Sequence, residues 1–517
     1  MTIVNNPKID AKLVGASVAV PNSAQRVLFV GQMTSAGTAT AGELYTDVDE
    51  PTAKTLFGPS SQLYNGIEFF KTINTDVPVD VIPLDDPAGV AADGKITFTA
   101  TSATEAGSLI VTLGETRNGQ FEVHVEIGDD GDAISLKTVN LVQAGTKCLM
   151  SAAVDGINAN ETNVTSENVG TIGNNLTISV TGTVAGVTYA VTGMANGTLV
   201  PTLTNVFDVI GETRYQTIVW PAEYGTTEVK ALLDARFNVE GQVKDGVAVM
   251  TEIGTKSEVL ATVNAENSQS LVFFVEETTT KNAYKGGSML ECPYSQSSIF
   301  AAIRSLRLTD GANIARYVNG AGGARDTTGG PAIASLPYFN TPVPGLPVPT
   351  LGYGWTSTEI EEIKEAGGSV MGSNVTGTDV LLGQIVTTYK TDIGGNPDVS
   401  WKYLNYVDTG SQSREYQVNN LLKDFVQSRL TTGDLEAFRN IANENSIRDA
   451  MVGYYGDLSG GDYVLLQSGE DALLFYKENL QVIIDMANGK VTIINKLPIV
   501  TQFREIDLTS QLAFSLQ

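Results

Sequence analysis

The stretch RVLFVGQ, at residues 26–32, indicates the fold class of this chain. A short continuous apolar run that ends in glycine is typical of a strand buried on both faces of a sheet. Residues 77–86, VPVDVIPLDD, form a second such run. Between the two runs, Leu63, Ile67 and Phe70 in the second half of residues 52–73 follow helical spacing. The order strand, helix, strand predicts an α/β core, with a mixed sheet and helices.

The same alternation of strands and helices resumes nearer the C-terminus. We expect strands within residues 215–224, 245–254 and 271–277, and a helix over residues 227–238. A further helix follows Thr356 or Ser357, either of which can cap it, and Gly367 comes after its end. We therefore assign the α/β core to residues 26–88 plus 206–399.

Residues 89–205 differ in composition from the segments on either side. Short alternating runs such as KITFTATSA and NLTISVTGTV are cut by glycine and asparagine. This pattern predicts a mostly β outer domain that is inserted into the core. Within it we expect one helix, over residues 145–160.

Residues 400–517 form a third region, which we interpret as a C-terminal α+β assembly domain. An amphipathic pattern predicts a helix over residues 414–430, and a second helix is expected over residues 433–445. The run LQVIIDMANGKVTIINKL, at residues 480–497, predicts a hairpin around Asn488-Gly489.

Both terminal segments have the pattern of extended arms. The last stretch, EIDLTSQLAFSLQ at residues 505–517, alternates so regularly that it predicts a strand with one buried face. The apolar residues on the predicted buried face are Ile506, Leu508, Leu512, Phe514 and Leu516. Residues 1–25 form the N-terminal arm, in which two prolines oppose a regular helix and Val14, Val18 and Val20 alternate with smaller residues.

The composition excludes several classes of partner. The chain has 517 residues, 42% hydrophobic and 17% charged, which is an ordinary globular balance. Its net charge is 32 − 58 = −26, so its surface repels nucleic acid and anionic lipid, and we expect neither as a partner. Cys148 and Cys292 are far apart and form no disulfide framework, which indicates folding in a reducing cytosol. We expect no export signal and no membrane span.

The residues that usually carry chemistry are sparse. The single histidine, His124, shares a predicted strand face with Glu122 and Glu126, which is a solvated strand face rather than a metal site. The glycine-rich run GAGGA, at residues 320–324, lacks phosphate-loop spacing. The acidic run DDGD, at residues 129–132, lacks the rest of a calcium loop. We therefore expect no catalytic residue, no cofactor and no metal.

Several stretches together resemble the contractile phage tail sheath proteins, especially the Mu-like branch. QRVLFVGQMTSAGTA resembles that family's first core strand and turn, and the segment AKTLFGPSSQLYNGIEFFKTINTDVPVDVIPLDD its first helix and second strand. VWPAEY, TPVPGLPVP and NKLPIVTQFREIDLTSQLAFSL follow in the family's order. The resemblance covers residues 1–88 and 206–517, and residues 89–205 match loosely.

The resemblance implies a structural role without an enzyme activity. Subunits of this family form stacked rings around a tail tube, with baseplate and tail terminator proteins at the ends, in a virion tail assembled in the host cytoplasm. Each subunit donates its N-terminal arm and its C-terminal strand to sheets of neighbouring subunits. Contraction then drives the tube through the host envelope. The resemblance also points to Arg414, Lys423 and Arg429 as candidate contacts to the tube.

Other functions remain open from the sequence. The chain can equally form the sheath of a phage-derived bacteriocin or injection particle. A surface adhesin or S-layer protein is suggested by the Thr/Asn/Gly-rich insertion, and the missing export signal argues against it. A cytosolic α/β enzyme is a third class, and the lack of a catalytic constellation argues against that. The terminal strand can also pack on the hairpin of its own subunit.

Overall fold

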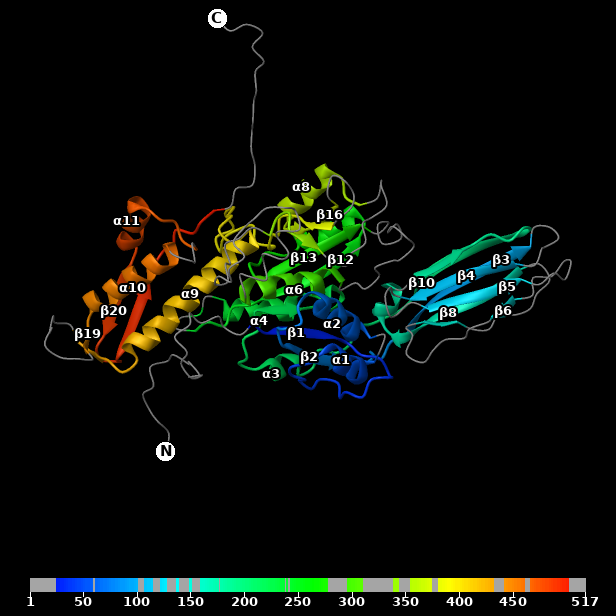
Figure 1. Cartoon of the computed structure of the whole chain (residues 1–517), viewed down its shortest axis with the longest axis horizontal. Helices are drawn as coiled ribbons and strands as arrows, with labels where there is room; N and C mark the ends of the chain where they lie inside the picture. The colour runs from blue at the N-terminus through cyan, green and yellow to red at the C-terminus, as the bar shows by residue number, and fades with distance from the viewer. Residues whose placement is uncertain are drawn as a thin grey trace, which may run out of the picture. The chain divides into compact units, whose positions relative to one another are not determined.

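The computed structural model divides the chain into two compact units (Figure 1). It describes residues 25–58, 61–100, 107–114, 121–127, 136–138, 148–150, 159–175, 177–237, 239, 242–277, 295–309, 338–343, 354–373, 380–431, 441–460 and 465–501. The described part of the larger unit extends to Val407, and that of the smaller unit begins at Asp408. The two units are described separately below.

A six-stranded sheet forms the centre of the larger unit, with the strand order β15-β13-β12-β11-β1-β2 and every pair parallel. Its strands are β1 (Val27–Gln32), β2 (Val79–Leu84), β11 (Thr217–Val219), β12 (Val247–Gly254), β13 (Leu271–Glu277) and β15 (Gly368–Ser369). Parallel strands need crossover connections, which helices provide here. The predicted α/β core is therefore confirmed, but the mixed sheet expected for it is wrong, because the described strands of the central sheet all pair in parallel.

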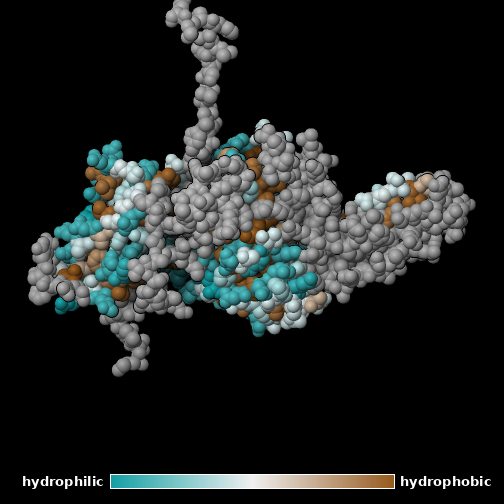
Figure 2. All heavy atoms as spheres, in the orientation of Figure 1, coloured by the Kyte–Doolittle hydropathy of each residue, from teal (hydrophilic) through white to brown (hydrophobic). Residues whose placement is uncertain are grey.

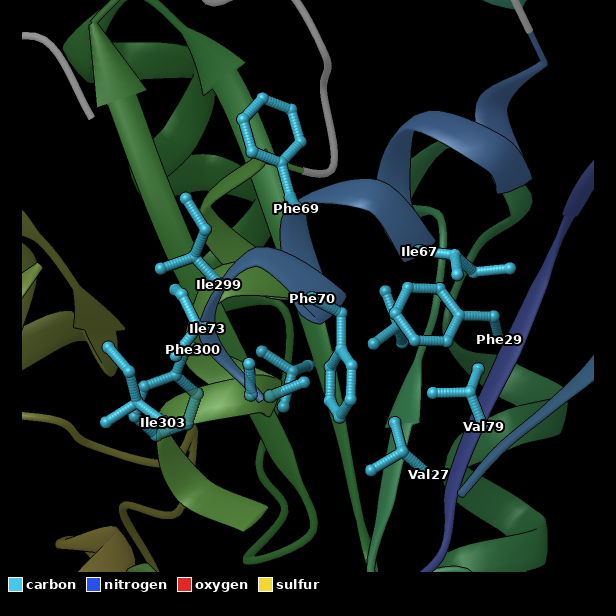
Figure 3. Close-up of a cluster of buried hydrophobic side chains, with 14 of the residues drawn as sticks. Val27, Phe29, Ile67, Phe69, Phe70, Ile73, Val79, Ile299, Phe300 and Ile303 are labelled. Carbon is cyan, nitrogen blue, oxygen red and sulfur yellow. The ribbon is translucent and has the colours of Figure 1, made fainter. Parts of the chain in front are cut away.

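Helices cover both faces of this sheet. They are α1 (Glu50–Phe57), α2 (Gln62–Ile73), α3 (Val206–Ile210), α4 (Thr227–Arg236), α5 (Lys256–Asn264), α6 (Ser295–Thr309) and α8 (Ser357–Ala366). On one face, α1, α2 and α6 pack on residues of one parity, such as Val27, Phe29 and Val79 (Figure 3). On the other face, α3, α4, α5 and α8 pack on the opposite parity, such as Leu28 and Ile82. Burial on both faces explains the continuous apolar runs of the sequence.

Local signals set the ends of several helices. Thr356 caps α8 in a reciprocal capping box with Glu359, and Gly367 ends the helix in the left-handed region with φ 97°. Ser61 caps α2 by accepting a hydrogen bond from the backbone N–H of Tyr64. The cap predicted at residue 356 is therefore confirmed.

One carboxylate is buried inside the sheet. Asp80, on β2, is fully buried, and its Oδ2 accepts hydrogen bonds from the Arg26 guanidinium at 2.6 and 3.1 Å and from the Tyr215 hydroxyl at 2.9 Å. Its Oδ1 accepts a bond from the backbone N–H of Asp47 at 3.2 Å. A buried charge is tolerated when it is paired and hydrogen-bonded in this way. Burial and the nearby carboxylate of Asp80 raise the pKa of Tyr215.

The inserted region contains two four-stranded sheets, β10-β3-β8-β7 and β6-β5-β4-β9. Their strands are β3 (Ala91–Ala100), β4 (Gly107–Gly114), β5 (Phe121–Ile127), β6 (Leu136–Thr138), β7 (Cys148–Met150), β8 (Ala159–Val169), β9 (Thr177–Thr181) and β10 (Val187–Ala195). The short 3-10 helix η1 (Thr171–Asn175) follows β8, and a second, η2 (Ala222–Tyr224), follows β11 in the core. Every paired strand of these two sheets runs antiparallel.

The two ends of the insertion lie side by side. Val90 and Thr198 form an antiparallel bridge, and the Thr198 N–H donates to the Val90 carbonyl at 3.1 Å. Asp86 provides a second link, because its Oδ1 accepts bonds from the side-chain amides of Gln32, on β1, and Asn168, on β8. The insertion is thus joined to the core by hydrogen bonds as well as by the chain.

A small three-stranded sheet completes the larger unit, in the order β14-β17-β16. Its strands are β14 (Pro342–Val343), β16 (Met371–Ser373) and β17 (Val380–Leu382). Val343, Val380 and Leu382 join the core on the side of α2 and α6.

Three predicted helices differ from the structure. Within residues 145–160 the described parts are strands, since β7 spans Cys148–Met150 and β8 starts at Ala159. The helix expected over residues 414–430 is α9, Leu404–Phe425, which begins earlier and ends before a short strand. The helix expected over residues 433–445 is wrong at its end, because Ile441–Ala442 form β19 and α10 begins at Glu444.

Candidate assembly surface

The hairpin of the smaller unit is the element most suited to bind another strand. Strands β20 (Gln481–Asp485) and β21 (Lys490–Ile494) pair antiparallel with Val482 opposite Ile493, so the predicted hairpin is confirmed. Asp485 organises the four-residue turn by accepting bonds from the backbone N–H groups of Ala487 and Asn488 at 3.0 and 3.2 Å. The side-chain amide of Asn488 also donates to this carboxylate, which lowers the pKa of Asp485. Gly489 has φ 62°, as this turn requires.

The two faces of the hairpin differ in burial. Val482 is buried on the face that packs against α10 (Glu444–Ser459). On the opposite face, Ile483 is 51% exposed and Ile494 is 49% exposed. Ile483 lies opposite Thr492, so Ile494 is its diagonal neighbour two positions along. The outer face therefore carries an exposed apolar pair. Figure 2 shows apolar atoms at the surface of the smaller unit.

The hairpin is a two-stranded sheet in the described part of the chain. A hairpin of two strands is at best marginally stable alone, and a third strand adds main-chain hydrogen bonds. After β21 the chain returns to form a bridge between Leu466 and Ile499, and the described part ends at residue 501. The exposed apolar face is the feature that suits this hairpin to packing against an added strand.

Two helices fix the position of this hairpin. The guanidinium of Arg448, on α10, donates to the carbonyl of Leu480 at 2.8 Å, just before β20. Helix α9 (Leu404–Phe425) lies along α10, and two reciprocal bonds join them: Tyr454 to Asp424 at 2.6 Å and Tyr416 to Asp457 at 2.8 Å. Burial and the hydrogen bond to Asp424 raise the pKa of Tyr454. Helix α11 (Glu470–Glu478) adds Tyr476, which stacks on Tyr455 at 4.6 Å between ring centroids.

The candidate tube contacts lie on different parts of the smaller unit. Arg414 is partly buried within α9, while Lys423 is exposed in the last turn of the same helix. Nine helical residues correspond to two and a half turns, so these side chains leave opposite sides of α9. Arg429 is exposed in β18 (Arg429–Leu430), which pairs in parallel with β19 (Ile441–Ala442). Lys423 and Arg429 therefore remain the exposed members of the set.

The other predicted site residues lie outside the described residues. These are Ile506, Leu508, Leu512, Phe514 and Leu516 of the C-terminal strand, and Val14, Val18 and Val20 of the N-terminal arm. Ile483 and Ile494 were not singled out from the sequence, although the alternation of the hairpin strands places both on one face. The alternation of side chains, counted outward along both strands from the turn at Asn488-Gly489, would have identified them.

The described residues offer no evident centre for chemistry. No group of three or more His, Cys, Asp or Glu side chains is placed to hold a metal within the described ranges. Among the helices that the structure describes, none is long and apolar enough to cross a membrane. His124 belongs to β5, opposite Ile110 of β4, and its side chain lies outside the described part, as do residues 129–132 and 320–324.

Comparisons with known proteins find similarity to sheath proteins. No protein-family model matches it. Among solved structures it is similar to the sheath tail protein of Desulfitobacterium hafniense, with 10% identity, TM-score 0.45, and coverage of 95% of this chain and 100% of that one. It is also similar to the sheath complex of an extracellular contractile injection system in its contracted state, with 10% identity, TM-score 0.47 and 99% coverage of each chain.

The curated relative extends along almost the whole chain. The sequence is 25% identical over 497 residues to the Mu-like prophage FluMu tail sheath protein of Haemophilus influenzae. The match covers 94% of this chain and 92% of the relative, so it includes the α/β core, the insertion and the smaller unit. The chain is thus a homologue of a Mu-like prophage tail sheath protein over 94% of its length.

Proposed function

We propose that this chain polymerises as the sheath subunit around a tail tube and contracts to drive that tube through a host envelope for genome delivery. The observation that carries the proposal is the β20–β21 hairpin, whose outer face presents an exposed apolar pair, Ile483 and Ile494. Its partners are other copies of the chain in stacked rings, the tube protein, and the baseplate and terminator proteins at the ends. It acts in the virion tail, after assembly in the cytoplasm of the host.

Subunits are linked by strand addition. The C-terminal strand, residues 505–517, and the N-terminal arm, residues 1–25, add to the hairpin sheets of neighbouring copies. Main-chain hydrogen bonds give continuity, and alternate apolar side chains fix the register. Covering a half-exposed isoleucine contributes about 1 kcal/mol, and many links in a lattice multiply a modest gain. Contraction then proceeds as rotation of nearly rigid subunits with the arms as hinges.

The parts of the chain divide this work. Residues 26–88 plus 206–399 form the sheath core, residues 89–205 an outer domain, and residues 400–517 the assembly domain, flanked by the arms. Lys423 and Arg429 are the candidates for contacts to the tube, because both are exposed cations on an acidic chain. Reversing both charges should weaken assembly on the tube at low salt, while reversal at Lys477 should not. Unchanged assembly would remove these two residues from the proposal.

The decisive experiment separates folding from assembly. A chain ending at Arg504 should keep the circular dichroism of the folded protein and form no tubes in electron micrographs. Ile494→Asp should have the same effect, because it places an unpaired charge where an added strand packs. Leu474→Asp is the matched control, since Leu474 is 55% exposed on α11, away from the hairpin, and tubes should persist. Leu508→Ile should also be tolerated.

Two results would contradict the proposal. Ordered tubes from the truncated chain would show that the terminal strand serves its own subunit. Global unfolding after truncation would show that the strand belongs to the intramolecular core. A phage-derived injection particle uses the same contacts, and the genes that neighbour this one distinguish it from a phage tail.

A further inference from the structure

Strand β10 (Val187–Ala195) leaves one edge of the inserted region open. It pairs antiparallel with β3 on one side, with Tyr189 opposite Phe98 and Val191 opposite Ile96. On its other side, no strand in the described part of the chain continues the ladder. Residues 188–193 are all exposed, and the hydrogen of Gly193 that a Cβ would replace points into open space.

The apolar face of this sheet continues out to that edge. Phe98 and Ile96 of β3 are buried, with 1% and 0% of their surface exposed, whereas Tyr189 and Val191 are 40% and 38% exposed. The hydroxyl of Tyr189 donates to the carbonyl of Val180, on β9, at 3.0 Å and so fixes its ring at the rim. Along the upper rim of the inserted region, where β10 lies in Figure 1, apolar atoms reach the surface in Figure 2.

The regular part of β10, residues 187–192, contains none of the usual protections of an edge strand. Natural edges carry lysine, proline, inward charges or strong bulges that prevent pairing with another chain. The strand VTYAVTGMA has no charge and no proline, and its irregularity lies beyond Thr192. Its regular part, residues 187–192, therefore presents a ready template for a further strand.

We propose that β10 pairs with β10 of a second copy of this chain, in an antiparallel register centred on Ala190. In that register Thr188 faces Thr192, and Tyr189 faces Val191. Thr–Thr and aromatic–β-branched pairs are among the favourable cross-strand pairs, and no like charges oppose each other. The strand is thus complementary to itself, which is the reason for choosing a second copy as its partner.

The proposed pairing differs in symmetry from the polymer contacts. A two-fold axis through Ala190 uses the same surface on both copies and closes after two. The links along a polar tube are instead head-to-tail and open-ended. The β10 contact therefore joins two free subunits, or two tubes, and never successive subunits of one tube.

Disulfide trapping in the full chain tests the register directly. In a background with Cys148→Ser and Cys292→Ser, Ala190→Cys should cross-link to itself under oxidised glutathione, because paired Cα atoms lie about 4.5–5.5 Å apart. Ala195→Cys is the matched control: it lies on the same strand, but its two copies would be about 33 Å apart. We expect at least about tenfold more covalent dimer from the first variant. Equal yields, or none from either, would overturn the proposal.

A charge swap tests the same contact without a covalent bond. Ala190→Lys and Ala190→Glu should each remain monomeric at concentrations below tube formation, because like charges oppose each other across the axis. Mixing the two should restore the dimer. Dimers in either variant alone, or no dimer in the mixture, would count against the pairing. Tube formation is measured separately by electron microscopy. Loss of the dimer with tubes retained would contradict only the β10 pairing, and loss of tubes with the dimer retained would contradict only the proposed function.

Discussion

Asp80 is a negative charge held inside the sheet of the larger unit. Its neighbours on β2, Val79 and Val81, are fully buried apolar residues, so the carboxylate depends on the Arg26 guanidinium and the Tyr215 hydroxyl. The sequence showed Asp80 inside an apolar run, but not its partners, because Tyr215 is 135 residues away. Long-range polar pairs of this kind are set by the tertiary fold, whereas the run itself predicted the strand.

The hydrogen bond from the Tyr215 hydroxyl should contribute more to the free energy of unfolding than a similar exposed hydrogen bond. Tyr215→Phe removes a hydrogen bond to a buried charge and should lower the free energy of unfolding by about 1.5–3 kcal/mol at pH 7. Tyr389→Phe is the control, since it removes a comparable bond to Asp398, 2.7 Å long, at a more exposed site, and should cost less than about 1 kcal/mol. Urea denaturation measures both. Equal losses would mean that Asp80 does not depend on this bond.

The same residue predicts how stability changes in alkali. Burial raises the pKa of Tyr215 above its ordinary value of 10.0 in the folded state. Above pH 10 the unfolded chain therefore loses this proton while the folded chain keeps it, so the contribution to stability falls as pH rises. The gap in unfolding free energy between the wild type and Tyr215→Phe should narrow above pH 10. A gap that stays constant up to pH 11 would contradict this assignment.

The helix pair α9–α10 supports the hairpin of the smaller unit. Tyr454 of α10 reaches Asp424 of α9, and Tyr416 of α9 reaches Asp457 of α10. The sequence predicted a helix here but misplaced its ends, because the apolar stripe from Val418 onward obscured the earlier start at Leu404. It also missed the strand at Cys148–Met150, where a short apolar run fits a helix or a strand equally well.

The two Tyr–Asp bonds should differ in strength. A double-mutant cycle with Tyr454→Phe and Asp424→Ala should give a coupling energy of about 1 kcal/mol or more, because this bond is partly buried. The cycle with Tyr416→Phe and Asp457→Ala should give less than about 0.5 kcal/mol, because that bond is exposed. Denaturant unfolding curves of the wild type and of the single and double mutants yield both coupling energies. A larger coupling at the exposed pair would reverse the assigned order.

At the scale of the whole molecule, the insertion leaves and re-enters the larger unit at a single place. Val90 and Thr198 are paired where the chain leaves and re-enters the core, whereas Val200 and Leu203 pack against the core itself. The change in composition predicted a β-rich insertion. It could not locate the return to the core, because residues 199–205 resemble a loop in sequence and are anchored by packing.

Removal of the insertion should leave a competent subunit. Replacing residues 91–197 with a short Gly/Ser bridge keeps the ends where the Val90–Thr198 pair already holds them. The shortened chain should fold, with less strand signal in circular dichroism, and should still form tubes. Replacing residues 89–205 removes Val200 and Leu203 as well and should lower stability. An insoluble product from the first deletion would show that the core needs the insertion.

The Val90–Thr198 pair also bears on how such proteins diversify. Two backbones in an antiparallel bridge have paired Cα atoms about 4.5–5.5 Å apart. For the core, the insertion therefore spans no greater distance than a tight turn would. Any module whose own ends lie at that spacing can replace it by recombination without changing the loop-closure entropy of the core. We therefore expect relatives to vary most in length here. A host that recognises the proposed outer domain would select for exchange of this one segment, while the core that the segment leaves and re-enters stays unchanged.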